Sequence, residues 1–320
     1  MSAHGPDPWW ESLAVMVEGG HTASDATELA DLLARAVRPV GLTVRAFLVD
    51  RPQRVLTRLD TADRAPDDVV EVDGTPGGEA FQLLRIAVAE DGDALWVPVV
   101  DGADRLGVLR LGLPAGADPH DEGLHQRCRV FAGLVGHVLA TKFPFSDTLQ
   151  RVRRTAGMHP AAELLWQLLP PQTITTPAAV VSAVVEPYDR VGGDAYDYSV
   201  DHDAVFVALF DAVGHDMQSG LTAAVALAAV RSARRGGERD LVELARAADR
   251  AIAANRGAGY RFASAALARL DTRTGRLSYL LAGHPPPLRL RPGAVATMDH
   301  TPRPPLGVLG GPDVPAAVEQ

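Results

Sequence analysis

Two extended segments joined by a polar turn constrain the fold of this 320-residue chain more than any other feature. The segments span residues 191–198 and 205–211, and the turn between them spans 201–204. This pattern predicts an antiparallel hairpin. If the two central turn residues stay unpaired, the register places Asp194 directly opposite Asp211.

Side chains that face each other across an antiparallel pair have Cβ atoms roughly 4.5–5.5 Å apart, and like charges at that distance repel. The same register puts Tyr196 opposite Leu209 and Tyr198 opposite Val207, so the two carboxylates end an otherwise apolar face. Converging carboxylates of this kind suit a hard divalent cation, Mg²⁺ or Mn²⁺. The alternative is a pair of solvated aspartates at the strand ends. Three glycines favour the metal site because they let the backbone come close to a bound ion: Gly192, Gly193 and Gly214.

Composition excludes several classes of protein. Apolar residues make up 47% and charged residues 22%, which predicts about two globular domains in a chain of this length. The net charge is -9 and no basic block is present, so a nucleic acid partner is not expected. Apolar runs are shorter than the roughly 20 residues of a membrane span, and the N-terminus lacks the pattern of a secretion signal. With Cys128 as the only cysteine, we expect a cytoplasmic protein without a membrane partner.

The first half of the chain alternates helical and extended patterns. Residues 1–24 read as a loose N-terminal extension, followed by a helix over 25–37. Two hairpins over 43–59 and 94–113 flank a short helix over 77–84. This order predicts a small antiparallel sheet with helices on one side.

Residues 25–140 resemble a GAF domain through the segments 72–82, 95–99 and 106–109. The resemblance implies a sensor domain that binds a small molecule or forms a dimer, but no set of residues identifies a ligand. Cys128 lies in a predicted helix, where we interpret it as a small buried residue and not as a chromophore attachment point.

A helical linker is expected over 141–171, where it ends at the Pro170-Pro171 pair. Its helices either form the seam of a homodimer that carries a signal from the first domain or pack on their own domains. Residues 172–320 then form the second domain. A helix over 217–235 is apolar nearly all round, which predicts burial in a layered structure. A second hairpin over 262–281 leads to His284 in a loop.

Five motifs of the second half occur in the order and spacing of one known family: Leu168-Leu169-Pro170-Pro171, 191–197, 210–215, 282–287 and 305–308. Residues from about 160 to 310 thereby resemble PPM-type, metal-dependent Ser/Thr protein phosphatases of the SpoIIE/RsbU-like branch. The resemblance implies an αββα sandwich for 172–320, and together with the GAF-like part it makes the chain an α+β protein.

The resemblance also implies a site. It makes Asp194 the bridging metal ligand, Asp211 a second ligand, and the backbone carbonyl of Ala212 a third. In the family a water held between two Mn²⁺ or Mg²⁺ ions attacks the phosphate. His215 and His284 are candidates for orienting the phosphate or protonating the leaving group, with a structural role in their loops as the alternative.

This chain departs from the family at two places. Asp216 stands where most relatives have glycine, which adds a carboxylate near the expected metals. Relatives also carry a Thr-Asp-Gly strand and a later Asp that complete the metal cluster, and these do not occur before Gln320. We therefore expect the natural chain to continue past Gln320.

Two functions remain open at this stage. The first is a metal-dependent Ser/Thr phosphatase that is controlled by the GAF-like domain in a partner-switching pathway and acts on a phosphoprotein of the anti-anti-sigma type. The second is a catalytically inactive sensor or scaffold with a degenerate phosphatase domain.

Overall fold

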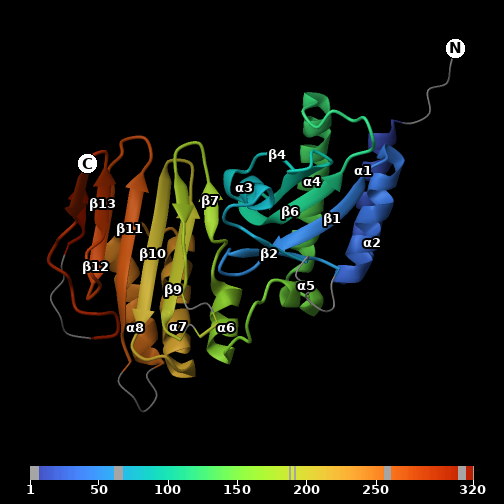
Figure 1. Ribbon diagram of the computed structural model, residues 1–320. Helices are drawn as coiled ribbons and strands as arrows, with labels where there is room; N and C mark the ends of the chain where they lie inside the picture. The colour runs from blue at the N-terminus through green and yellow to red at the C-terminus, as the bar shows by residue number, and fades with distance from the viewer. Residues whose placement is uncertain are drawn as a thin grey trace. The chain divides into compact units, whose positions relative to one another are not determined.

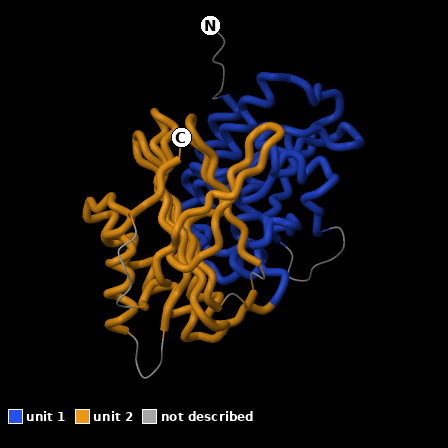
Figure 2. Tube along the Cα trace, turned by 90° about the vertical axis from the view of Figure 1, so that its left-hand side faces the viewer, with its two compact units in different colours: residues 1–156 blue, residues 157–320 orange. Residues whose placement is uncertain are grey.

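The computed structural model describes residues 7–60, 68–186, 189–190, 192–255, 261–308 and 315–319. Val191 of the second motif and Gln320 lie outside these ranges. The chain divides into two compact units, Met1–Ala156 (unit 1) and Gly157–Gln320 (unit 2) (Figure 2). The division falls within the stretch 141–171, whose role as a linker stays a prediction.

Unit 1 is built on an antiparallel six-stranded sheet with the order β3-β2-β1-β6-β5-β4 (Figure 1). Its strands are β1 (Thr43–Val49), β2 (Val55–Arg58), β3 (Val69–Glu71), β4 (Ala87–Val88), β5 (Ala94–Asp101) and β6 (Asp104–Gly112). Its helices are α1 (Pro8–Gly20), α2 (Ala26–Val37), α3 (Pro76–Leu83), α4 (Glu122–Lys142) and α5 (Asp147–Val152), with a 3₁₀ turn over Arg38–Val40. The two predicted hairpins and the short helix between them are confirmed.

The expectation of a loose N-terminus is wrong for residues 8–20, which form α1. Pro8 occupies the first turn, where its missing N–H costs nothing, and the Asp7 side chain accepts a hydrogen bond from the Trp9 N–H at 3.0 Å. Met16 is 1% exposed, so the helix is held by burial in the core of unit 1. The cap and the apolar spacing were both visible in the sequence.

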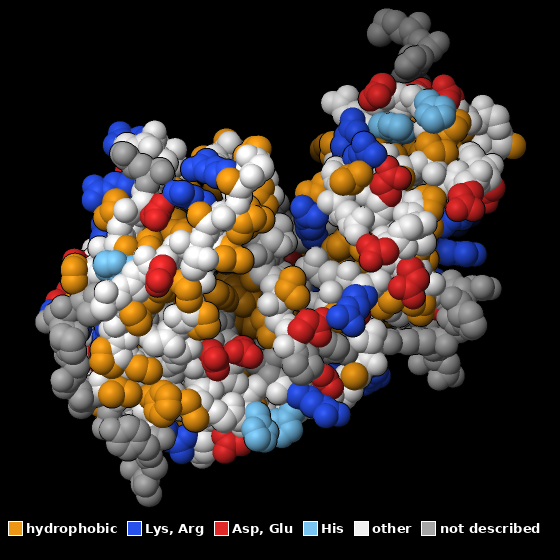
Figure 3. Space-filling model, turned by 60° about the vertical axis from the view of Figure 1, so that its left-hand side comes forward, with side chains coloured by type: hydrophobic (Ala, Val, Ile, Leu, Met, Phe, Trp, Pro, Cys, Tyr) orange, Lys and Arg blue, Asp and Glu red, His pale blue; other side chains and the backbone are white. Residues whose placement is uncertain are grey.

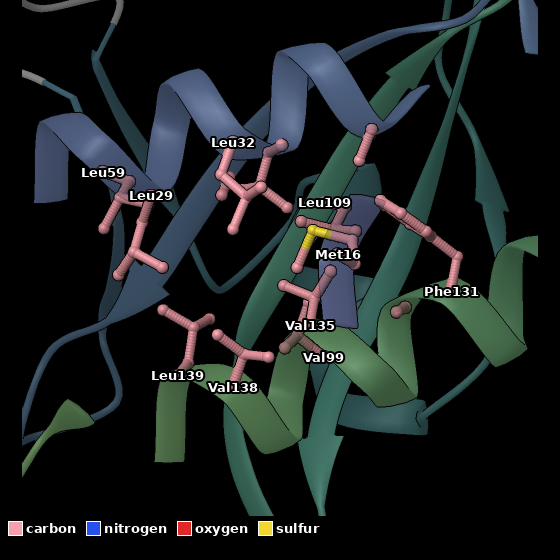
Figure 4. Close-up of a cluster of buried hydrophobic side chains, with 14 of the residues drawn as sticks. Met16, Leu29, Leu32, Leu59, Val99, Leu109, Phe131, Val135, Val138 and Leu139 are labelled. Carbon is pink, nitrogen blue, oxygen red and sulfur yellow. The ribbon is translucent and has the colours of Figure 1, made fainter. Parts of the chain in front are cut away.

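The core of unit 1 has two parts, one on each side of the sheet. On one side, the side chains of Met16, Leu109 and Val135 meet between α1, the sheet and α4 (Figure 4). Cys128 of α4 belongs to this part, and its burial raises the pKa of the thiol to about 12, so the predicted buried position is confirmed. On the other side, α3 covers Phe47 and Trp96, whose ring centroids lie 5.3 Å apart, so the expectation that the helices lie on one side of the sheet is wrong.

Unit 2 is built on an antiparallel five-stranded sheet with the order β15-β12-β11-β10-β9. These strands are β9 (Asp194–Val200), β10 (Ala204–Ala212), β11 (Ala263–Asp271), β12 (Leu277–Ala282) and β15 (Ala317–Glu319). Two separate hairpins consist of β7 (Thr173–Thr175) with β8 (Val180–Ser182), and of β13 (Leu288–Arg291) with β14 (Ala294–Thr297). The helices are α6 (Pro160–Leu168), α7 (Met217–Arg235) and α8 (Leu241–Ala254).

Helices α7 and α8 lie together on one face of this sheet (Figure 1). Alternate residues of β10 point into this layer, and Phe206, Ala208 and Phe210 are all buried there. The small buried residues of α7, such as Ala223 and Ala226, allow close packing, although Leu221 on its outer side remains 46% exposed. The predicted burial of α7 therefore holds for one side of the helix.

Both units mix helices with antiparallel sheets, so the predicted α+β class is confirmed. Of the αββα sandwich, the described residues of unit 2 form a helical layer, the five-stranded sheet and the two separate hairpins. Among the helices in the described part of the chain, none has both the length and the apolar character that crossing a membrane requires.

Candidate active site

The predicted register of the β9–β10 hairpin is confirmed. Asp194 pairs with Asp211, and Tyr196 pairs with Leu209 on the same face. At the turn, the Asp201 N–H donates to the Ala204 carbonyl at 2.9 Å. The two aspartates therefore meet at the end of the hairpin that lies away from its turn.

The neighbouring strand extends this pair into a row. Ser264 of β11 pairs with Asp211, so three polar side chains cross β9, β10 and β11 at the same level. The Ser264 Oγ lies 2.7 Å from Nδ1 of His284, which follows β12 in the next loop. Sequence reasoning placed Asp194, Asp211 and His284 as candidates but missed Ser264, because β10 and β11 are separated by two helices and no local signal sets their register.

The row opens into a cavity of about 400 Å³ in unit 2. Its lining includes Asp194, Asp211 and His284, with apolar walls from Val184, Tyr196 and Leu209. Val184 and Leu209 are 74% and 50% exposed, and Figure 3 shows hydrophobic and acidic side chains side by side on this side of the molecule. The volume falls in the range typical of sites for small ligands.

Burial and mutual repulsion shape the charges of the row. Loss of solvent raises the pKa of Asp194, and the facing Asp211 raises it further. The residue keeps some solvent exposure, so this desolvation is partial. Burial lowers the pKa of His284 and outweighs the opposite effect of the two aspartates. The metal-free site therefore disfavours a second negative charge and favours a neutral imidazole.

Glycines hold the loop that follows β10 against the start of β9. A Cβ atom on Gly193 would lie 2.3 Å from the Ala212 carbonyl oxygen, and one on Gly192 would lie 2.6 Å from the backbone of His215. Only glycine fits at such distances. The pair thus sets the position of the Ala212 carbonyl beside the two aspartates.

Asp216 acts as the N-cap of α7. One oxygen of its carboxylate accepts hydrogen bonds from the N–H groups of Gln218 and Ser219, and these bonds lower the pKa of this exposed side chain. The residue that departs from the family pattern therefore has a structural role at a helix start. His215 beside it is exposed and, unlike His284, is not among the described residues that line the cavity.

The remaining motif residues support the site from outside it. Tyr196 and Tyr198 donate hydrogen bonds, each at 2.8 Å, to the carbonyls of Pro170 and Pro171, so the Leu-Leu-Pro-Pro motif fastens α6 to β9. The Gly307 N–H donates at 2.8 Å to Asp249 of α8, which fixes the 305–308 motif on that helix.

His284 is positioned by the same C-terminal segment. Gly283 has a φ of +65°, a conformation that suits glycine, and its N–H donates to the Arg303 carbonyl at 3.0 Å. A Cβ atom on Gly283 would lie 2.6 Å from Pro305. The loop that carries His284 is therefore held against the segment that contains Arg303 and Pro305.

The donor set of the row fits one hard divalent cation. Asp194, Asp211 and the Ala212 carbonyl supply oxygen ligands, and Mg²⁺ in proteins commonly takes one or two carboxylates with waters and substrate phosphate at its other positions. Within the described ranges, no group of three or more His, Cys, Asp or Glu side chains is arranged to hold a metal. The second ion of the family site therefore stays a prediction.

Comparison with known proteins agrees with the motifs. Residues 201–320 match the family model described as Stage II sporulation protein E (SpoIIE), which confirms the predicted resemblance for this segment. No curated protein matches the chain.

Solved structures of both expected kinds are similar to parts of the chain. The RsbU and RsbW domains of a Mycobacterium tuberculosis protein share 28% identity over 42% of this chain and 37% of theirs, with a TM-score of 0.37. The SiaA-PP2C domain of Pseudomonas aeruginosa shares 24% over 40% of this chain and 51% of its own, with a TM-score of 0.35. The chain thus spans less than two thirds of each of these structures. A GAF domain of an Acinetobacter phosphoenolpyruvate-protein phosphotransferase shares 15% over 43% of this chain and 98% of its own, with a TM-score of 0.34.

Proposed function

We propose that this chain is a regulatory, metal-dependent phosphatase that hydrolyses phosphoserine or phosphothreonine on a protein substrate. The observation that carries the proposal is the row formed by Asp194, Asp211 and Ser264, with His284 hydrogen-bonded to Ser264. Asp194, Asp211 and His284 line a cavity of about 400 Å³. The match of residues 201–320 to the SpoIIE family supports the choice of reaction.

Each residue of the row has a distinct task in this proposal. Asp194 and Asp211, with the Ala212 carbonyl, hold the cation. When bound, Mn²⁺ or Mg²⁺ lowers the pKa of a water and offsets the charge that builds on the phosphoryl oxygens. Ser264 engages Nδ1 of His284, so proton exchange with the substrate falls to Nε2 of that ring. His215 is given no part in proton exchange here, because it does not line the cavity as His284 does.

The walls of the cavity suit a phosphorylated side chain on a protein surface. Its lining combines polar side chains, among them Asp194, Asp211 and His284, with apolar contacts from Tyr196, Leu209 and Val184. A phosphoserine places its phosphate next to the carboxylate pair through the cation and leaves its own backbone at the apolar rim. We propose a phosphoprotein of the anti-anti-sigma type as the substrate. We also propose that the GAF-like unit 1 controls the activity and that the chain forms a homodimer.

Hydrolysis of p-nitrophenyl phosphate and of a phosphoserine protein tests the proposal. Both activities should require Mn²⁺ or Mg²⁺. Asp194→Asn and Asp211→Asn should lower turnover by at least about 100-fold. Mutating a residue that only contacts a metal ligand costs up to about 100-fold, and losing a ligand itself should cost at least as much. Asp201→Asn is the matched control, since Asp201 is exposed at the far end of the same hairpin. Equal activity of Asp194→Asn and the unmutated chain would contradict the proposal.

A non-catalytic sensor or scaffold is the second candidate. It is favoured by the lack of a group of three or more metal-binding side chains among the residues that the structure describes. Calorimetric titration of the 320-residue chain with Mn²⁺ separates the two. Binding that disappears in Asp194→Asn supports the phosphatase and argues against the scaffold.

A further inference from the structure

Lys142 is the only lysine in the chain, and the other basic side chains among the 31 Lys and Arg residues are all arginine. It is the last residue of α4, and it is 8% exposed, although lysine is among the residues that are least often buried. A chain that uses arginine at every other basic position thus places its one lysine side chain largely inside unit 1.

A cavity of about 500 Å³ lies beside this amine, between α1 and α4. It is independent of the proposed active site, since all the residues lining it belong to unit 1. Apolar side chains form much of its wall, and two imidazoles join Lys142 as its polar groups. The lining includes Val17, His21, Leu134, His137, Lys142 and Phe145.

The ammonium of Lys142 is incompletely compensated by the protein. Its Nζ lies 5.7 Å from the centre of the Phe145 ring, a cation–π contact. Within the described part of unit 1, Lys142 forms no ion pair with a carboxylate. The side chain as a whole is 8% exposed, while its Nζ is not one of the buried atoms without a hydrogen-bond partner, so the ammonium itself stays in contact with solvent beside the cavity. A lysine in the last helical turn interacts favourably with the helix dipole. An exposed arginine would interact with the dipole equally well, so the dipole does not explain why Lys142 is largely buried.

We propose that this cavity binds an amphipathic carboxylate, a molecule with one carboxylate group and a hydrophobic chain. The carboxylate pairs with the Lys142 ammonium, and the hydrophobic chain covers Val17, Leu134 and Phe145. Val17 and Phe145 are otherwise 49% and 64% exposed. The imidazole of His21, which also lines the cavity, can donate a further hydrogen bond to the carboxylate oxygens.

The chemistry of the walls selects this class of ligand. One ammonium matches one negative charge, so a small dianion such as free phosphate would bring excess charge and leave the apolar wall uncovered. His137 already has Asp101 as a neighbour, with Nδ1 and Oδ1 3.3 Å apart, and this carboxylate disfavours a second anion at that side of the rim. On the opposite side of the sheet, buried Phe47, Phe81 and Trp96 fill the space under α3.

Calorimetry with the 320-residue chain and dodecanoate, kept below its micelle concentration, tests the site. Dodecyltrimethylammonium is the control probe because it has the same chain and the opposite charge. Dodecanoate should bind and the cation should not. Lys142→Met, which keeps the length of the stem, should weaken dodecanoate binding at least about tenfold, the loss expected for one charged partner. Arg129→Met is the matched control, since Arg129 is exposed on the same helix.

A labelling experiment checks the site without a mutation. Reductive methylation reaches two amines in this chain, the N-terminal amine and Lys142. Dodecanoate should slow the methylation of Lys142 at least about tenfold and leave the N-terminal amine unchanged as an internal reference. Equal labelling of Lys142 with and without dodecanoate would overturn the proposal. So would a dimer that buries this face and excludes dodecanoate, because a second copy would then be its occupant.

Discussion

Asp194 and Asp197 lie three residues apart on β9 and face opposite sides of the sheet. Asp194 faces the cavity, whereas Asp197 is 2% exposed and pairs with Arg231 and Arg234 of α7, with Nη2–Oδ distances of 2.6 and 2.8 Å. Odd spacing along a strand sends two side chains to different faces. One motif therefore contains one aspartate that lines the cavity and one that forms buried ion pairs with α7.

Asp197→Asn should destabilise the chain by about 3 kcal/mol, because it leaves two largely buried guanidinium groups without a negative partner. Denaturant unfolding measures the loss. Asp194→Asn is the comparison on the same strand and should not be destabilising. A wild-type midpoint for Asp197→Asn would contradict the assigned structural role.

Asp194→Asn should raise the melting temperature of the metal-free chain at pH 7. The folded-state pKa of Asp194 is raised above its ordinary value of 3.8, first by desolvation and then by Asp211. Its stabilising contribution is thus fully present below that value and is lost as the pH rises through the folded-state pKa.

Melting curves in the presence of a chelator, at pH 7 and at about pH 3, check this sign. The gain from Asp194→Asn should be present at pH 7 and vanish at the lower pH, where the carboxyl is protonated in both the folded and the unfolded chain. Added Mn²⁺ should reverse the order by stabilising only the unmutated chain. A gain of equal size at both pH values would argue against a desolvated carboxylate.

Gly193→Ala should abolish Mn²⁺ binding while retaining most of the fold. The new Cβ would lie 2.3 Å from the Ala212 carbonyl oxygen, so the loop after β10 must move. Calorimetry and circular dichroism measure the two effects. The control is Gly157→Ala, since a Cβ there meets nothing within 4 Å. Unchanged Mn²⁺ affinity in Gly193→Ala would exclude the Ala212 carbonyl as a ligand.

Ser264→Ala should lower kcat about 10- to 100-fold with little effect on KM, because Ser264 positions His284 without touching the substrate itself. The His284 ring resonances in an NMR spectrum should shift, which a purely structural change at a distant site would not cause. Ser278→Ala on β12 serves as the control. Equal kcat for Ser264→Ala and the unmutated chain would remove His284 from the mechanism.

The sequence was sufficient for the contacts that a single hairpin determines. The turn at 201–204 and the alternation of side chains set the register, so the meeting of Asp194 with Asp211 followed from local rules. Ser264 could not be placed in the same way. It reaches Asp211 only because α7 and α8 return the chain to β10, and the packing of those helices is a property of the whole unit.

The sequence also could not predict the roles of individual residues within the motifs. Asp194 and Asp197 are both acidic residues of the motif 191–197, and only the partners on α7 distinguish them. Asp216 was expected to add a carboxylate near the metals, whereas its carboxylate is engaged by the first N–H groups of α7. In both cases the deciding contact comes from a helix whose position the sequence does not state.

The polar row lies at one end of its strands, which leaves the opposite end available for engineering. The turns at 201–204 and 271–275 join the same strands about seven residues from Asp211, roughly 23 Å away at about 3.3 Å per residue. A fluorescent reporter or an affinity tag inserted in either turn would therefore sit on the same rigid sheet as the row without entering it. Such a graft would report motions of the sheet while the chemistry stays intact.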